Sequence, residues 1–89
     1  MKLLKIMEDI YFCDSLTSLK DEEKIQNENI THIITTESME LLISKNYNIF
    51  FVDFNGESPE NTAYRLCPRV SDFLREVLLL KGKLLLINN

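Results

Sequence analysis

The side chains best suited to chemistry in this sequence are its single histidine, its two cysteines and two carboxylates beside one turn. His32 lies within the largely β-branched run 31–36, which is typical of a strand. A catalytic histidine needs a nucleophile or an acid nearby, and none is adjacent to His32 in the sequence. We therefore expect His32 to be structural, paired with backbone groups at a strand end.

The two cysteines, Cys13 and Cys67, lack the surroundings that activate a thiol. Neither belongs to a CxxC pair, and Cys67 precedes Pro68 inside a segment expected to be helical, away from any helix start. Both are predicted to be reduced and to pack in the interior, with Cys13 the easier of the two to reach. Because one histidine and two distant cysteines do not make a zinc site, we expect no metal and no cofactor.

Asp53 and Glu57 flank the turn that follows the strongest predicted strand. A carboxylate just past a strand end can act as a general acid. Glu57 also stands directly before Ser58 and Pro59, a helix-start pair, so capping, interaction with the helix dipole or simple hydration is the commoner explanation. The chain contains no glycine-rich phosphate loop, GxSxG motif or HExxH motif.

An alternation of strands and helices has to position these residues. Apolar and β-branched runs predict strands over 10–12, 31–36, 48–54 and 84–87. Helices are predicted over 15–28, 62–81 and, as a short turn, 38–44, with a further helix start at Ser58. We expect Asn29 and Gly82 to end the two longer helices. The pattern favours a single α/β domain over 1–89 with a mainly parallel sheet flanked by helices.

The apolar face expected to be buried is less regular in the first of the two longer helices than in the second. In the first helix the charged run 20–24 is predicted to be a solvated face. Its candidate core side chains are Leu16, Leu19 and Ile25. The second helix has an apolar stripe at steps of three or four, and we expect this stripe to be core. The stripe consists of Ala63, Leu66, Val70, Phe73, Leu74, Val77 and Leu80.

The strands at 49–52 and 84–87 are apolar on both faces, as strands covered on both sides are. Only one long apolar-faced helix is available to cover them, so the sequence resembles half of a three-layer domain. Either a longer chain, a protein partner or a second copy is expected to supply the missing layer.

Composition excludes several classes of partner. The chain has 89 residues and a formal net charge of −4. The isoelectric point is near 4.9. This balance, with no basic stripe, argues against nucleic acid and against an anionic membrane. No signal peptide or membrane-spanning run is present, so we expect a cytoplasmic or nuclear protein.

Four local strings, taken in order along nearly the whole chain, resemble the dual-specificity branch of the protein-tyrosine phosphatases. The segment 6–13 is similar to the opening strand of that domain, and Asn-Ile-Thr-His-Ile-Ile at 29–34 is similar to the family's Gly-Ile-Thr-His-Ile-Ile. Leu-Cys-Pro at 66–68 followed by Asp-Phe-Leu at 72–74 resembles its aromatic-rich helix. Gly-Lys-Leu-Leu-Leu at 82–86 resembles the strand that leads into the catalytic loop.

The resemblance implies a truncated, inactive version of that domain. In the family a His-Cys pair and a loop ending in Gly-x-Ser-Arg follow the last strand, whereas here Ile87 occupies the histidine position and Asn88 the nucleophile position. The family's general-acid position falls on Glu57, with Asp53 as the fallback. Asparagine cannot form a phosphoenzyme, so the resemblance is greatest to the catalytically inactive STYX-like pseudophosphatases.

Three functional hypotheses follow. The leading one is a non-catalytic phosphatase-like protein, or the N-terminal half of one, that acts by protein binding or self-association through an uncovered sheet face. The alternative from the enzyme class is the N-terminal half of an active phosphatase whose catalytic cysteine loop lies outside this chain. The third is a truncated product without a function of its own, with exposed apolar strands.

Overall fold

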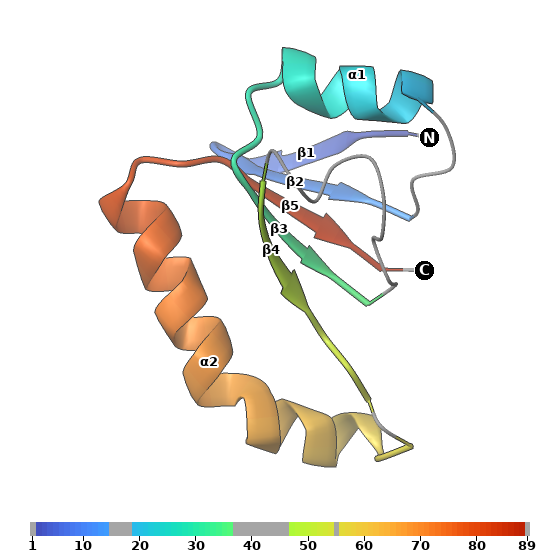
Figure 1. Ribbon diagram of the computed structural model, residues 1–89, viewed down its shortest axis with the longest axis vertical. Helices are drawn as coiled ribbons and strands as arrows, with labels where there is room; N and C mark the ends of the chain where they lie inside the picture. The colour runs from blue at the N-terminus through green and yellow to red at the C-terminus, as the bar shows by residue number, and fades with distance from the viewer. Residues whose placement is uncertain (1, 15–18, 37–46, 55, 89) are drawn as a thin grey trace.

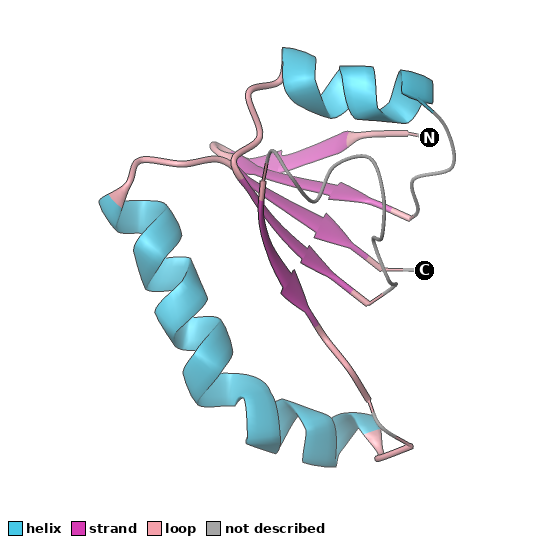
Figure 2. Cartoon of the chain, in the orientation of Figure 1, coloured by secondary structure: helices cyan, strands magenta, loops and turns pink. Residues whose placement is uncertain are grey.

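The computed structural model of the chain describes residues 2–14, 19–36, 47–54 and 56–88. Within these ranges the chain forms a mixed α/β fold with five strands and two helices, traced in Figure 1 and coloured by type in Figure 2. The strands are β1 (Leu4–Met7), β2 (Ile10–Cys13), β3 (His32–Thr35), β4 (Asn48–Phe51) and β5 (Leu84–Ile87). The helices are α1 (Leu19–Asn27) and α2 (Pro59–Leu79). The helical turn expected over 38–44 lies outside the described residues.

The five described strands form one sheet in the order β1-β2-β5-β3-β4. β5 pairs in parallel with β2 on one side and with β3 on the other, and β4 is parallel to β3. Only β1 runs antiparallel, along β2, so the predicted mainly parallel sheet is confirmed. The strand that comes last in the sequence is therefore the middle strand of the sheet.

β1 is not among the predicted strands, and this is a correction. Its four residues are all exposed, and only Ile6 is branched at Cβ. Neither an apolar pattern nor β-propensity therefore marks this strand in the sequence. It forms because the chain turns back at Glu8 and Asp9, where Asp9 adopts φ +67, a conformation that aspartate tolerates. β1 thus depends on pairing with β2 for its existence.

α1 packs on the face of the sheet to which the odd-numbered residues of β2, β3 and β5 point. Ile25 is buried there in one cluster with Tyr11, Ile33 and Leu85, so its predicted core role is confirmed. Asp21, within the run predicted to be solvated, is buried as well. It precedes Ile25 by four residues and therefore shares the inward face of the helix.

The end of α1 follows the prediction. Asn29 has φ +60, the left-handed conformation expected of a residue that stops a helix. Its N–H donates to the Gln26 carbonyl at 3.0 Å, and the Ile30 N–H donates to the Ile25 carbonyl at 3.2 Å. These two bonds form a Schellman motif, which satisfies the last carbonyls of the helix.

The predicted start of α2 is also confirmed. Ser58 caps the helix, and its hydroxyl accepts a hydrogen bond from the Asn61 N–H at 3.2 Å. Pro59 occupies the first turn, where its missing N–H costs nothing. Local chemistry alone was enough to locate this helix start.

The predicted end of α2 is wrong in detail. The residue with positive φ is Lys81, at +52, and Gly82 follows it in an ordinary conformation. The Lys81 N–H donates to the Leu78 carbonyl at 3.2 Å and the Gly82 N–H to the Val77 carbonyl at 2.9 Å. The chain therefore closes a Schellman motif with lysine at the position where glycine is usual.

Gly82 has a different role, which is to let the start of β5 approach the start of β3 closely. It is buried, and a Cβ atom at this position would collide with the Thr31 hydroxyl and lie 2.9 Å from Nδ1 of His32. The Lys83 N–H donates to the Thr31 hydroxyl at 2.9 Å, which draws the start of β5 against the start of β3. Any side chain at residue 82 would push these strand starts apart.

The apolar stripe of α2 is only partly core, which contradicts the prediction. Leu66 and Val77 are buried, whereas Leu74 and Leu80 are exposed. Figure 1 shows that α2 bends along its length. Pro68 lies inside the helix, where it removes one backbone hydrogen bond and favours such a bend.

Within the described ranges, each face of the sheet is contacted by one helix, so the expected half of a three-layer domain needs correction. α1 covers one face, and α2 lies against the other through Phe73, whose ring meets those of His32 and Phe50 edge-on at 5.4 and 5.6 Å. Among the described residues, neither helix combines the length and apolar character needed to cross a bilayer.

Candidate functional site

The carboxyl ends of β2, β5 and β3 lie side by side at one end of the sheet (Figure 1). Parallel α/β sheets usually bind ligands just beyond this end. Asn88 directly follows β5 there, and its backbone N–H donates to the Cys13 carbonyl at 3.2 Å. From the other side, the Thr36 hydroxyl donates to Oδ1 of Asn88 at 3.4 Å. Asn88 therefore links the ends of β2 and β3 across the middle strand.

Ile87 and Asn88 provide no group for covalent chemistry. Ile87 is buried in the cluster on the α1 face, where its side chain contributes to packing. Asn88 is exposed, and its amide can donate and accept hydrogen bonds but cannot act as a thiolate does. This end of the sheet can hold a polar ligand group, but these two residues cannot attack one.

The two cysteines differ in exposure. Cys13 is buried beside Ile87, and its predicted packing role is confirmed. Cys67 is exposed, so its predicted packing role is wrong. The reason is the position of α2, which turns Cys67 toward an apolar groove lined by Val52 and Phe54 rather than into the core. Both cysteines are free thiols.

The predicted general acid, Glu57, is engaged in an ion pair. Its Oε1 accepts a hydrogen bond from Nε of Arg65 at 2.7 Å, and Nη2 of Arg65 donates to the Asp53 carbonyl at 2.5 Å. The guanidinium thus ties the chain after β4 to the second turn of α2. Both side chains of the pair are partly exposed, so it contributes about 0–1 kcal/mol. The geometry supports a role for Glu57 in holding the start of α2.

His32 is buried within a polar cluster that joins β3, β4 and α2. Its Nδ1 lies 2.7 Å from the Thr31 hydroxyl, and its Nε2 lies 3.2 Å from Oε2 of Glu76 and 3.3 Å from the Asn48 amide. Nε2 faces both a carboxylate oxygen, which accepts, and an amide nitrogen, which donates, so the tautomer decides which of the two it pairs with. The structural role is confirmed, although these partners are side chains rather than backbone groups.

Two apolar grooves open beside α2. The first, of about 330 Å³, runs along the N-terminal half of the helix and is lined by Phe54, Leu66 and Cys67 among others. The second, of about 500 Å³, lies between the β1–β2 turn and the last turns of α2, and we call it the hairpin groove. Its apolar lining is Ile10, Leu74, Val77, Leu78 and Leu84. Residues of the α2 stripe that the sequence predicted to be core thus line these two grooves.

Several of these partners were missed by sequence reasoning. Asn48 lies opposite His32 only because β3 and β4 pair in that register, and Thr36 approaches Asn88 only because β3 neighbours β5. Arg65 follows Glu57 by eight residues, a spacing that becomes a contact only when the turn before α2 folds back. Long-range pairing leaves no local signal, so no single-sequence pattern could have identified these residues.

Comparison with known proteins assigns no family to this chain. No protein-family model matches it, and no curated protein matches its sequence. The function has to be inferred from the geometry and from the resemblance described above.

Proposed function

We propose that this chain is a non-catalytic, phosphatase-like module that acts by binding another protein. The observation that carries the proposal is Asn88, which stands at the carboxyl end of the middle strand, between Cys13 of β2 and Thr36 after β3. The phosphatase resemblance puts the nucleophile at this residue. An amide there permits hydrogen bonding and excludes a phosphoenzyme intermediate.

The arrangement of strands supports the resemblance. The strand expected to lead into a catalytic loop is β5, and a site built on it would be flanked by a strand on each side. The carboxyl ends of β2, β5 and β3 point the same way, which is the arrangement that a phosphate-binding loop would require. Glu57, at the family's general-acid position, is paired with Arg65, which supports a structural rather than a catalytic role for it.

The surface supports the binding half of the proposal. Apolar grooves line α2, and exposed leucines gather at its C-terminal end. Contiguous apolar surface of this kind usually marks a site of protein interaction. A binding role therefore uses the features that the fold displays, whereas catalysis would need features that Ile87 and Asn88 lack.

The direct test is an assay of the purified chain with a small aryl phosphate and a phosphotyrosine peptide. We expect no turnover above blank, and the same result for Asn88→Ala. Turnover that Asn88→Ala abolishes would refute the proposal. Cys67→Ser is the control for the exposed thiol, because activity lost only in that variant would come from Cys67 and would also contradict a non-catalytic role.

A further inference from the structure

We propose that the hairpin groove binds a second copy of this chain, as a two-fold symmetric dimer. The inference rests on the proposed function, since it names the partner of one protein-binding surface. The groove, of about 500 Å³, lies between the β1–β2 turn and the C-terminal turns of α2. Leu74 and Leu78 line it from the helix, and Ile10 and Leu84 line it from the starts of β2 and β5.

The apolar lining of this groove has a buried floor, formed by Val77 and Leu84, and an exposed edge at Leu78. Leu78 lines the groove and is also 78% exposed, so it projects from the surface as well as bordering the hollow. Exposed large hydrophobic residues also occur on β1 and around the C-terminal end of α2: Leu4, Ile6, Met7, Leu74, Leu78, Leu79 and Leu80. A projecting leucine beside an apolar hollow is complementary to the same pair of features on another copy.

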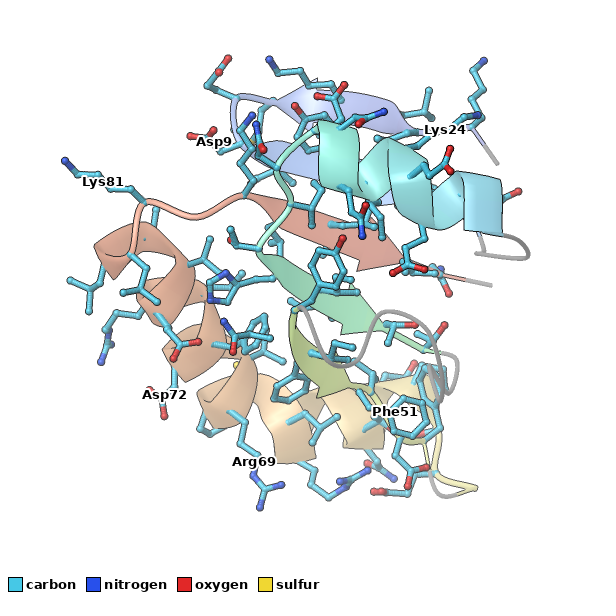
Figure 3. All side chains as sticks on the ribbon, turned by 45° about the horizontal axis from the view of Figure 1, so that its top comes forward. Asp9, Lys24, Phe51, Arg69, Asp72 and Lys81 are labelled. Carbon is cyan, nitrogen blue, oxygen red and sulfur yellow. The ribbon has the colours of Figure 1, made fainter. Side chains whose placement is uncertain are left out.

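The charges of the groove favour a copy of this chain over other partners. The β1–β2 turn contributes Glu8 and Asp9, and the end of α2 contributes Lys81. Glu8 also pairs with Lys5 of the same chain at 3.2 Å, in an exposed ion pair that contributes little to stability. Figure 3 labels Asp9 and Lys81 at the same end of the molecule, on these two different elements. A two-fold axis would place the acidic turn of each copy opposite the basic helix end of the other, twice in one interface.

Partners with charge of one sign fit less well. A nucleic acid would bring phosphates against Glu8 and Asp9, and a uniformly basic protein would meet Lys81. The net charge of −4 on each copy repels at long range, but physiological salt screens that repulsion beyond about 8 Å. The short-range pairing of opposite charges is therefore the term that selects the partner.

The first test is the molar mass of the full chain in solution, measured by sedimentation over roughly 1–200 µM at physiological salt. We expect a concentration-dependent monomer–dimer equilibrium that Leu78→Asp weakens by about tenfold or more in Kd. Tyr64→Asp is the matched control, because Tyr64 is 85% exposed on the same helix and lines neither groove. A wild-type chain that stays monomeric throughout, or a dimer that Leu78→Asp leaves unchanged, would overturn the inference.

The second test is a charge swap. Lys81→Glu alone and Glu8→Lys alone should each weaken self-association, because each leaves like charges facing across the interface. An equimolar mixture of the two variants should form a heterodimer, because an acidic side chain then faces a basic one at both charged contacts of the interface. Arg69→Glu controls for net charge, as Arg69 is exposed on α2 outside the hairpin groove. An equal effect of Arg69→Glu, or no recovery in the mixture, would contradict the inference.

Failure of this inference can be told apart from failure of the proposed function. A monomeric chain without phosphatase turnover would overturn only the dimer. Turnover that depends on Asn88 would overturn the non-catalytic function, whatever the oligomeric state. Far-ultraviolet circular dichroism of each variant distinguishes a lost interface from a lost fold.

Discussion

The two faces of the sheet differ in how completely they are covered. On the α1 face the aligned residues Tyr11, Leu85 and Ile33 are all buried, and Ile49 at the β4 edge of the same row is partly buried. One residue further on, in the aligned row Phe12, Leu86, Ile34 and Phe50 of the α2 face, every side chain is only partly buried. Helix length does not explain this difference, because α1 has 9 residues and α2 has 21.

The difference in coverage follows from where each helix lies on the sheet. α1 connects β2 to β3, which are separated by β5, so a short helix crosses the middle of the sheet. α2 connects the edge strand β4 to β5, and its N-terminal half lines a groove with Val52 and Phe54, beyond the end of β4. A helix can bury only the part of a sheet face that it covers. Much of α2 lies past the end of β4 or to the side of the strands, so it covers its face incompletely.

The largest expected effect compares two neighbouring residues of β5. Leu85→Ala should lower the free energy of unfolding by about 2–5 kcal/mol, because Leu85 is fully buried on the α1 face. Leu86→Ala, on the α2 face, should cost about 1 kcal/mol, because the Leu86 side chain is already partly exposed. Urea unfolding at low protein concentration measures both without a contribution from association. Equal costs would show that the two faces are equally covered.

A second comparison concerns the two glycines, of which Gly82 lies where β5 approaches β3. Gly82→Ala should destabilise the fold by about 1–3 kcal/mol, because the new methyl group would meet Thr31 and His32. Gly56→Ala should cost about 1 kcal/mol, since Gly56 has open space around it but a φ of +75. The midpoints of urea unfolding give the order. A larger loss at Gly56 would contradict the close approach of strand starts.

The smallest expected effect is a pH dependence on the α1 face. Burial, followed by the hydrogen bond to Glu28 at 3.0 Å, raises the pKa of Tyr11 above its usual value. The unfolded chain releases this proton near pH 10 while the folded chain retains it, so stability should fall as the pH rises above about 10. Tyr11→Phe should make that fall shallower in alkaline urea titrations.

Two other tyrosines make this pH comparison sharper. Tyr64 is 85% exposed on α2, so Tyr64→Phe is the control for removing a tyrosine hydroxyl outside the core. Burial, and to a lesser extent the charge of Glu22, raises the pKa of Tyr47 too, so part of the slope should remain in Tyr11→Phe. A slope that is insensitive to Tyr11→Phe would show that its hydroxyl is not held by the fold.

Much of the fold was predictable from short-range patterns, and the exceptions have physical causes. Ser58 and Asn29 were assigned correctly because a helix cap depends on the few residues around it. β1 was missed because it is exposed and is stabilised by its pairing with β2. Cys67 was placed in the core because a helical stripe shows which residues share a face but not whether that face meets the sheet.

At the candidate site, the position of the residues along a strand was predictable and their contacts were not. Ile87 and Asn88 were located at the end of a strand from the sequence, and the structure places them there. Pairing of Glu57 with Arg65 and of His32 with Glu76 joins residues from different elements, so it required the tertiary fold.

Local sequence was sufficient for the types of the predicted elements and for the helix boundaries at Ser58 and Asn29, because each depends on side chains a few residues apart. Packing decided that β5 lies in the middle of the sheet, that α1 covers its face better than α2 does, and that leucines of α2 border an open groove. These outcomes depend on which strands pair and where each helix lies, and both are set by contacts between residues far apart in the chain.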